Sequence, residues 1–429
     1  MKKRVVLTGL GAVVPHGHSV AQAWPRIRDG ESAVGRITYY DPNGHKTQIA
    51  AQVPEGFDAP QTCGPFALSD DAMRFVWGAT REALAQAHLD NEGGPSARRA
   101  VVCTTGVGPA TLGSLGGEMV RSVPPDDDPW KADLGQFFSQ IADAPDAIEM
   151  RGFLVDDCAP LVSWMAAAPQ TYNVASACAA GTHALADAVA IIERDEADVV
   201  VASGVCTGIN AVLVNGFSIL GALSTRNDDP EGASRPFDSD RDGFILAEGA
   251  ATIVVESLDH ALARGATPLA EVLGWGLSCD AYRLTDPEPG GTGMSLSMQR
   301  ALEYAGLAPS DIDYVNAHGT STPYNDAAET LAIRNTFGAH TDALPVSSSK
   351  SMFGHLIQAA GLLEAIVCVK SLEDGWIPPT INSQNQDPAC DLDIVPNHGR
   401  AQDIQRVMSN SFGFGGQNAT IILKRWESS

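Results

Sequence analysis

The chain has 429 residues, and its 28 basic and 52 acidic side chains give a net charge of −24 at pH 7. So acidic a chain disfavours a nucleic-acid partner and an anionic membrane surface. With 44% hydrophobic residues, disorder is not expected, and the length suits two or three domains or one large α/β unit. No uncharged apolar run reaches the roughly 18 residues of a membrane span, so no span is expected.

Eight cysteines are scattered along the chain. They form no C-x-x-C pair and no Cys/His cluster with ligand spacing, so neither a disulfide framework nor a metal site is expected. The apolar run that follows the basic N-terminus is interrupted by Thr8 and Gly9, too early for a signal peptide. We therefore expect free thiols in a reducing compartment and a cytoplasmic location.

In the first part of the chain, apolar runs bounded by turn residues predict strands, and amphipathic runs predict helices. The expected strands are residues 3–10 (ended by Gly11), 100–105, 172–176, 198–203 and 250–256. The expected helices are residues 19–29, 69–88, 181–195 and 257–264, with a helix or turn at 215–223 and a polar loop at 224–241. Residues 111–168 hold helical patches at 132–141 and 160–167, and we expect this segment to form a lid or a subunit interface.

From residue 269 the order of elements starts again. The expected strands are residues 269–277, 312–317, 344–349, 407–412 and 418–424, and the expected helices are 293–305, 323–337 and 355–372. The strand, turn and helix of residues 172–195 match those of residues 344–372. We predict two α/β halves, residues 1–256 and 257–429, whose strand ends meet at a crevice of the kind that binds ligands.

Cys178 lies where the strand at 172–176 turns into a helix, among the small residues of the run ASACAAG. The first backbone N–H groups of a helix favour a thiolate, which is the nucleophilic form of cysteine. The alternative is a small buried cysteine with no chemical role, which is the commoner situation for a cysteine.

Three polar segments of the second half are expected at the same crevice. His318 ends a strand and is followed by glycine and three hydroxyl residues, although a capped turn histidine would look alike. Lys350 and His355 straddle a turn between apolar segments, and a buried lysine there requires a carboxylate. Candidates for that carboxylate are Glu364, Glu329 and Asp326.

The third segment is the glycine-rich run at residues 413–416, which includes Phe414 and can pass close to a ligand. Two neutral imidazoles beside an acyl-cysteine suit the stabilisation of an enolate rather than the activation of water. Backbone N–H groups at Cys178 and in the glycine-rich run can form an oxyanion hole for acyl transfer.

At this point the chain resembles the β-ketoacyl-acyl-carrier-protein synthases of the elongating Cys-His-His type, including synthase II and the type II polyketide ketosynthases. The matching runs are ASACAAG, ALSTRND, SRPFDSDRDGF, NAHGTSTPYND, SSSKSMFGHLIQAAG, PPTIN and NSFGFGGQN. The resemblance implies the thiolase fold, a duplicated five-layered α-β-α-β-α architecture, and a dimer. It implies an acyltransferase that joins an acyl chain to malonyl-acyl-carrier protein by decarboxylative Claisen condensation, in fatty acid or specialised type II polyketide or polyene synthesis.

The resemblance also assigns roles to residues of this chain. Cys178 would be the acylated nucleophile, and His318 and His355 would bind the malonyl thioester and promote decarboxylation. Lys350 would support the histidines and pair with Glu364.

The remaining implied roles concern substrate binding. Phe414 would act as a gate, and its N–H would complete the oxyanion hole with that of Cys178. Thr320 and Thr322 would hold the phosphopantetheine arm of the acyl carrier protein, and Phe217 and Phe412 would line the acyl pocket. No permanently bound cofactor is implied.

The chain departs from the family pattern in three places. Residues 111–168 look lengthened by an insertion. Gly221 and the stretch 66–71 lack the basic side chains that usually meet an acidic carrier protein. Asn325 and Gln417 replace a usual glycine and a usual threonine.

Two other functions stay open at the level of sequence. One is a non-catalytic chain-length-factor subunit, although such partners lack the cysteine. The other is a thiolase or acyltransferase that uses coenzyme A without decarboxylation. For a ketosynthase, we expect either a homodimer or a heterodimer with a cysteine-less homologue.

Overall fold

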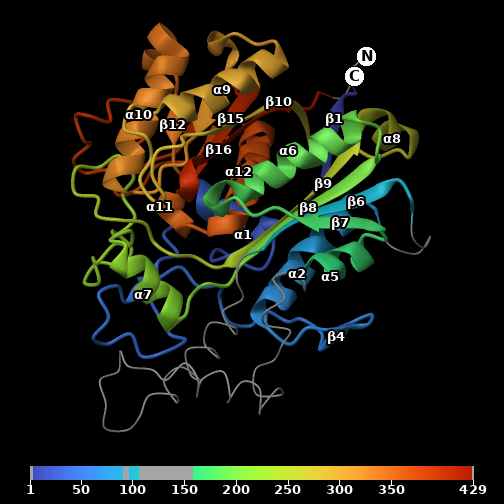
Figure 1. The fold of residues 1–429 in the computed structure, drawn as a ribbon, viewed down its shortest axis with the longest axis horizontal. Coiled ribbons are helices and arrows are strands. Elements are labelled where there is room, and N and C mark those ends of the chain that lie inside the picture. The colour runs from blue at the N-terminus through green and yellow to red at the C-terminus, as the bar shows by residue number, and fades with distance from the viewer. Residues whose placement is uncertain (1–2, 90–95, 106–157, 428–429) are drawn as a thin grey trace.

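The computed structural model describes residues 3–89, 96–105 and 158–427 of the chain (Figure 1). Ten strands of this part form one sheet. In chain order they are β1 (Val5–Val13), β6 (Arg99–Thr105), β7 (Gln170–Asn173), β8 (Val199–Cys206), β9 (Gly249–Ser257), β10 (Ala270–Cys279), β11 (Tyr314–Asn316), β12 (Val346–Ser347), β15 (Arg406–Gly413) and β16 (Gln417–Arg425).

The sheet has the order β12-β11-β15-β16-β10-β1-β9-β8-β6-β7, and its two halves repeat one pairing pattern. In the first half β7, β6 and β8 are parallel, whereas β9 and β1 are antiparallel to their neighbours. In the second half β12, β11 and β15 are parallel, and β16 and β10 are antiparallel. The predicted repetition of strand order is confirmed by this topology. The boundary after residue 256 stays a proposal, and it falls one residue before the end of β9.

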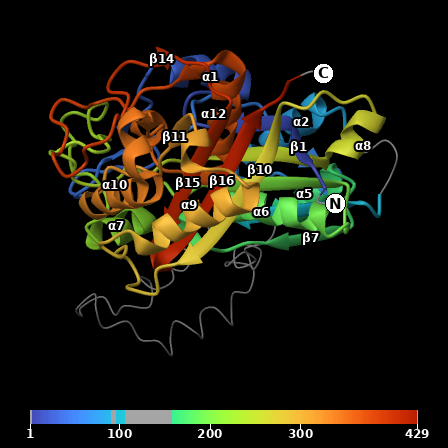
Figure 2. The same cartoon turned by 90° about the horizontal axis from the view of Figure 1, so that it is seen from above.

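Helices cover the sheet in layers (Figure 2). The described helices are α1 (Val20–Arg28), α2 (Asp71–Gln86), α5 (Cys158–Met165), α6 (Ala180–Glu193), α7 (Ala211–Ile219), α8 (Leu258–Ala263), α9 (Thr292–Ala305), α10 (Pro323–Phe337), α11 (Lys350–Phe353) and α12 (Ala360–Asp374). Helices α6 and α12 contact each other and strands of both halves. Helices α2 and α5 pack on strands of the first half, and α9 packs on β10 and β16 with α10 against it. The order of layers is therefore outer helices, first-half strands of the sheet, the two central helices α6 and α12, second-half strands and outer helices.

Three two-stranded ribbons complete the described elements. They are β2 (Gly35–Arg36) with β3 (Ile49–Ala50), β4 (Thr62–Cys63) with β5 (Phe66–Ala67), and β13 (Trp376–Ile377) with β14 (Arg400–Ala401). Within the described residues, no helix is both long and apolar enough to cross a membrane.

The two central helices, α6 and α12, come into close contact near their N-terminal ends, where each carries a glycine. A Cβ added at Gly361 would lie 2.2 Å from Thr182 Oγ1 and 2.6 Å from the Thr182 nitrogen. A Cβ added at Gly181 would lie 2.8 Å from the Leu362 nitrogen. Because the chain segments just before these ends carry Cys178 and His355, the close crossing brings the two halves of the site together.

Several predicted boundaries are wrong for identifiable reasons. Strand β1 does not end at Gly11, because Gly11 pairs with Thr252 and leaves room for the Ala79 carbonyl of α2. The helix expected from His355 begins at Ala360, since His355 itself forms an extended bridge with Leu246. The helical patch at 132–141 lies outside the described residues, and the patch at 160–167 falls largely within α5.

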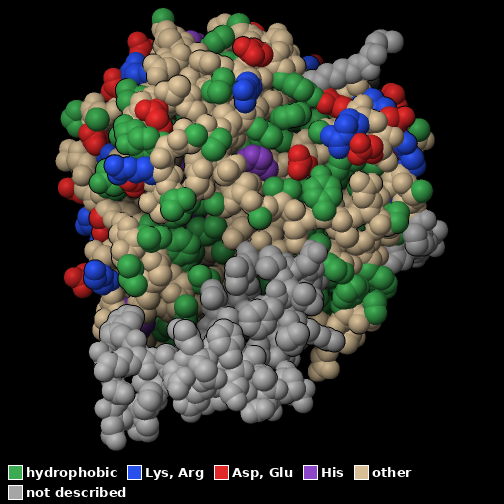
Figure 3. Space-filling model, in the orientation of Figure 1, with side chains coloured by type: hydrophobic (Ala, Val, Ile, Leu, Met, Phe, Trp, Pro, Cys, Tyr) green, Lys and Arg blue, Asp and Glu red, His purple; other side chains and the backbone are tan. Residues whose placement is uncertain are grey.

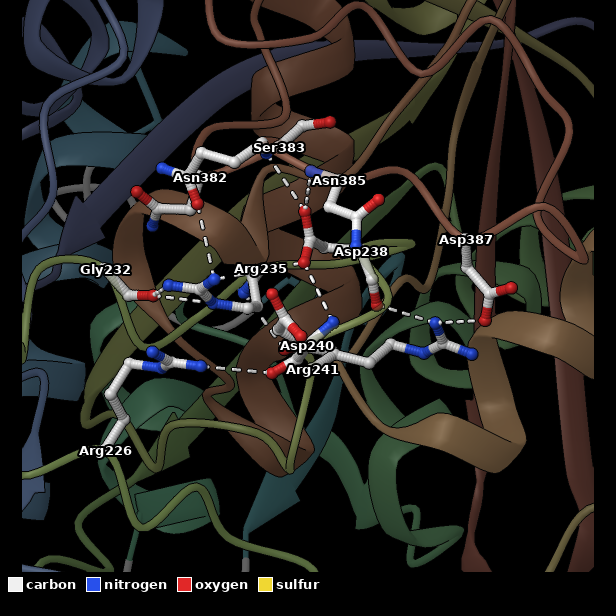
Figure 4. A network of polar contacts seen from close by, with 12 residues as sticks. Arg226, Gly232, Arg235, Asp238, Asp240, Arg241, Asn382, Ser383, Asn385 and Asp387 are labelled. Atoms are coloured by element: carbon white, nitrogen blue, oxygen red, sulfur yellow. Dashed lines mark hydrogen bonds and ion pairs between the residues drawn. The ribbon is translucent and has the colours of Figure 1, made fainter.

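The polar loop at 224–241 is held by a network of charged groups, of which Arg235, Asp238 and Arg241 are buried (Figure 4). Asp238 Oδ2 accepts hydrogen bonds from the backbone nitrogens of Gln384 and Asn385, at 3.0 and 2.7 Å. Arg241 pairs with Asp387 at 2.7 Å and approaches Asp326 of α10 at 3.7 Å. The loop is thereby fixed to the second half of the chain, next to the turn that carries His318.

The glycine contact between α6 and α12 predicts that two glycine-to-alanine substitutions change the free energy of unfolding in opposite directions. In Gly361→Ala the new methyl group meets backbone and side-chain atoms of Thr182, and overpacking of this kind costs about 1–3 kcal/mol. In the control Gly216→Ala, nothing lies within 4 Å of the new methyl group, and alanine in helix α7 stabilises by roughly 0.5–1 kcal/mol. Denaturant unfolding of both variants measures the difference, and equal stabilities would contradict the proposed contact.

Candidate active site

Cys178 lies on a tight turn between β7 and α6. The residues Ala177–Ala179 form one 3₁₀ turn, and α6 starts directly after it at Ala180. Ala177 has a φ of 48°, a left-handed conformation that an alanine rarely adopts. The strained turn places the Cys178 thiol at the N-terminal end of the central helix, where it is 7% exposed.

Burial is the largest influence on the protonation state of Cys178. Burial raises the pKa of the Cys178 thiol to about 11, whereas hydrogen bonding from the Phe414 backbone and the positive charge of Lys350 lower it by less. Removing the charged sulfur from water therefore outweighs the helix terminus, which by itself favours the thiolate. The resting group is a thiol that must lose its proton during the reaction.

His318 is held by its backbone. Glu329 of α10 accepts hydrogen bonds from the nitrogens of His318 and Gly319, both at 2.8 Å. Burial raises the pKa of Glu329 to about 7, although these two hydrogen bonds oppose the shift. Gly319 has a φ of 40°, and a Cβ there would lie 2.5 Å from that of Ser348, so the turn requires glycine.

The Lys350 ammonium contacts both the ring and the backbone carbonyl of His318. Its Nζ atom lies 3.2 Å from His318 Nδ1, donates to the His318 carbonyl at 2.8 Å and forms an ion pair with Glu364. An ammonium can only donate, so His318 Nδ1 is an acceptor and the ring proton resides on Nε2. Burial, followed by the charge of Lys350, holds the pKa of His318 well below its usual value.

His355 is oriented in an equivalent way by the backbone. The backbone N–H of His355 donates to the Ile245 carbonyl at 2.7 Å, and the ring atom Nδ1 accepts the backbone N–H of Ile357 at 3.2 Å. The ring proton therefore also resides on Nε2, which has no hydrogen-bond partner among the described residues. Burial, and then Lys350, hold the pKa of His355 well below its usual value. The His318 and His355 rings meet edge to face, with centroids 5.3 Å apart.

The three carboxylates considered as partners for Lys350 have different neighbours. Glu364 forms the ion pair, and burial raises its pKa to about 7 while Lys350 pulls it down. Asp326 accepts the N–H of Phe237 at 2.9 Å and lies near Arg241, and Glu329 holds the His318 turn.

The glycine-rich run passes directly over the nucleophile. A Cβ added at Gly413 would lie 3.1 Å from the nitrogens of both Cys178 and Ala179. The next residue, Phe414, directs its N–H to the Cys178 sulfur. The N–H groups of Cys178 and Phe414 are therefore placed to receive negative charge on an oxygen bonded next to that sulfur.

One cavity of about 380 Å³ joins these groups to the surface. Among the residues expected at the site, its wall includes Cys178, His318, His355, Thr320, Thr322, Phe412 and Phe414. The hydroxyls of Thr320 and Thr322 lie 2.9 Å apart. Lys350 and the three carboxylates lie behind this wall rather than in it.

Phe412 lines the cavity, whereas Phe217 does not. It belongs to an apolar cluster that also contains Cys178, and its ring packs on Phe244 at 5.5 Å. Phe244 lines the cavity and meets His355 edge to face at 5.3 Å. Sequence reasoning did not single out Phe244, and the one available signal was its position at the end of the SRPFDSDRDGF run.

Comparison with known proteins agrees with this geometry. The description "Beta-ketoacyl synthase, N-terminal domain" matches residues 2–142 and 158–261, and "Beta-ketoacyl synthase, C-terminal domain" matches residues 269–384. The chain belongs to the β-ketoacyl synthase family. Its enzyme class is that of the acyltransferases of the ketosynthase type.

Full-length relatives support the assignment. The chain is 40% identical over 426 residues to 3-oxoacyl-[acyl-carrier-protein] synthase 2 of Coxiella burnetii, covering 99% of each chain. It is 37% identical to the protein of the same name from Synechocystis sp., again covering 99% of each chain.

Solved structures match over almost the whole chain. The ishigamide ketosynthase/chain length factor matches with a TM-score of 0.85 and 32% identity, covering 100% of both chains. A β-ketoacyl synthase from Burkholderia phymatum matches with a TM-score of 0.84 and 33% identity, covering 99% of this chain and 100% of that one. The expected layered, thiolase-like α/β architecture is thereby confirmed.

The raised pKa of Cys178 predicts how its alkylation depends on pH. Between pH 7 and 9 the rate of reaction with iodoacetamide should rise about tenfold per pH unit, because only the thiolate reacts. Mass spectrometry of the Cys178 peptide measures this rate, and glutathione in the same tube is the control with an ordinary thiol pKa. A rate that is already constant at pH 7 would contradict a protonated resting thiol.

Proposed function

We propose that the chain condenses an acyl group held on Cys178 with malonyl-acyl-carrier protein and releases CO2 and a 3-oxoacyl-acyl-carrier protein. The observation that carries this proposal is the convergence of two kinds of donor on one cavity. The neutral Nε2–H groups of His318 and His355 suit a thioester enolate, and the N–H groups of Cys178 and Phe414 suit a tetrahedral oxyanion.

The first step is the transfer of the acyl group. The Cys178 sulfur attacks the thioester carbonyl, a new C–S bond forms, and the bond to the pantetheine sulfur breaks. The thiol proton of Cys178 goes to the departing pantetheine sulfur, so the exchange needs no net proton. The Cys178 and Phe414 N–H groups lower the energy of the oxyanion between the two bonds.

The second step forms the carbon nucleophile. A malonyl thioester loses CO2, and the electron pair of the broken C–C bond becomes an enolate whose oxygen accepts hydrogen bonds from His318 and His355. A neutral imidazole can donate a hydrogen bond to the enolate oxygen without being charged itself, and burial strengthens this hydrogen bond. The Lys350 ammonium contributes from behind His318, where it lies against Nδ1 and keeps the proton on Nε2.

The third step joins the two fragments. The enolate carbon attacks the acyl-Cys178 carbonyl, the oxyanion forms again at the Cys178 and Phe414 N–H groups, and its collapse expels the Cys178 sulfur. Burial favours the thiol over the thiolate, so the sulfur takes up one proton per turnover.

Other residues bind the substrates in this proposal. Thr320 and Thr322 hold the phosphopantetheine arm, Phe412 and Phe217 line the acyl pocket, and Phe414 gates the cavity. Glu364, Asp326 and Glu329 support the site from behind. The substrates arrive on an acyl carrier protein, no permanently bound cofactor takes part, and the location is the cytoplasm.

The assembly is a homodimer or a heterodimer with a chain-length-factor homologue. A structural neighbour of 30% identity and TM-score 0.87, covering 99% of this chain and 100% of that one, is described as an acyl-carrier protein in complex with its ketosynthase. We propose the heterodimer for a specialised polyketide or polyene pathway, and full elongation by the purified chain alone would count against it.

The two alternative functions fit less well. A chain-length factor has no need for a cysteine on a strained turn facing two histidine N–H donors. A thiolase-type reaction uses a second cysteine as base, and Cys178 is the single cysteine among the described residues that line the cavity.

Two substitutions separate the steps of the proposed reaction. His355→Ala should lower CO2 release from malonyl-carrier protein by about 10²–10³-fold, the typical effect of removing one such donor, while Cys178 still becomes acylated. Cys178→Ala should abolish acylation and elongation. Labelled CO2 and mass spectrometry of the protein measure the two steps.

The parent protein supplies the control for this prediction. One CO2 should appear for each 3-oxoacyl product. Elongation without CO2 release, or elongation by Cys178→Ala, would contradict the proposed function.

A further inference from the structure

The mouth of the cavity exposes large apolar side chains from several segments. Leu220 follows α7 and is 56% exposed, and Tyr324 at the start of α10 is 71% exposed; both line the cavity. Next to them in the chain lie Ile219, 84% exposed, and Leu284, 85% exposed beside the lining residue Thr285. On the face in Figure 3, hydrophobic side chains gather left of centre. A group of exposed apolar side chains of this kind indicates an interaction surface. We call these four residues the apolar rim.

The charged groups at the same mouth are acidic. Asp242, Asp280 and Asp286 line the cavity, and the described lining residues include no lysine or arginine. Arg283 is exposed beside the rim, but its guanidinium pairs with Asp286 at 3.0 Å. An acidic docking partner would therefore meet carboxylates and an already paired arginine.

A carrier protein must sit on this rim if the proposed function holds. Its pantetheine arm carries the thioester to Cys178 through the mouth, so the body of the carrier contacts the residues around that mouth. The strongly acidic net charge of −24 adds long-range repulsion toward an acidic carrier rather than attraction. Contact area at the rim must then come from apolar groups.

We infer that the acyl carrier protein docks on the apolar rim through an apolar face, and not through ion pairs to basic residues in the described part of this chain. The inference rests on the proposed function, because it takes the carrier protein as the occupant. It specifies a partner whose surface near the pantetheine-bearing serine is apolar and weakly charged.

Salt dependence distinguishes apolar docking from docking by ion pairs. Between about 50 and 500 mM NaCl, kcat/KM for acyl-carrier protein should stay within about twofold or rise, because salt screens repulsion and leaves apolar contacts intact. Docking by ion pairs predicts a fall of about tenfold or more over the same range, and such a fall would overturn the inference.

Substitution of residues of the apolar rim provides a second test of the inference. The double variant Ile219→Ser/Leu284→Ser should raise KM for acyl-carrier protein about tenfold, equivalent to about 1.4 kcal/mol. Acylation of Cys178 by a small acyl-pantetheine thioester should not change, since neither residue lines the cavity. The control is Leu262→Ser, an exposed leucine on α8 at a distance from the mouth.

The outcomes are distinguishable. A double variant that behaves like Leu262→Ser would overturn apolar docking and leave the proposed function standing. A change in oligomeric state on gel filtration, with KM unchanged, would assign the rim to a second copy of the chain and overturn the inference. Failure of the parent protein to acylate Cys178 from either donor would overturn the proposed function itself.

Discussion

The buried ion pair between Lys350 and Glu364 is the interaction on which the site depends. Both side chains are essentially inaccessible, at 1% and 0% exposure, and a lone charge at such a position would cost several kcal/mol. The pair is tolerated because the ammonium also donates to the His318 carbonyl and lies against His318 Nδ1. One cation thereby fixes the turn and the tautomer of His318, and it disfavours protonation of both histidines.

The duplicated fold is what lets two distant segments build one site. In each half a strand leads through an irregular turn into a central helix, and the two helices cross at Gly181 and Gly361. The first turn supplies the thiol and the second supplies His355. Positive φ angles occur near each functional group, at Ala177, Ser321 and Ile357, so a strained backbone residue accompanies each turn of the site.

The sequence allowed the strand order and the position of Cys178, His318 and His355 to be predicted, because each lies at a junction between an apolar run and a small-residue turn. Residue spacing could not choose among three carboxylates for Lys350, since that choice depends on which side of a helix faces inward. The sequence also could not weigh burial against the helix terminus at Cys178. Gly11 misled the prediction because it serves the packing of α2 on β1 rather than a turn.

The central claim is that His318 and His355 are neutral N–H donors, and ¹⁵N NMR of histidine-labelled protein tests it directly. Variants His318→Asn and His355→Asn assign the two rings. Between pH 6 and 8 both rings should give the signals of the neutral Nε2–H tautomer, because burial and Lys350 oppose protonation. A ring that takes up a proton near the ordinary histidine pKa of about 6.5, or that carries its proton on Nδ1, would contradict the account.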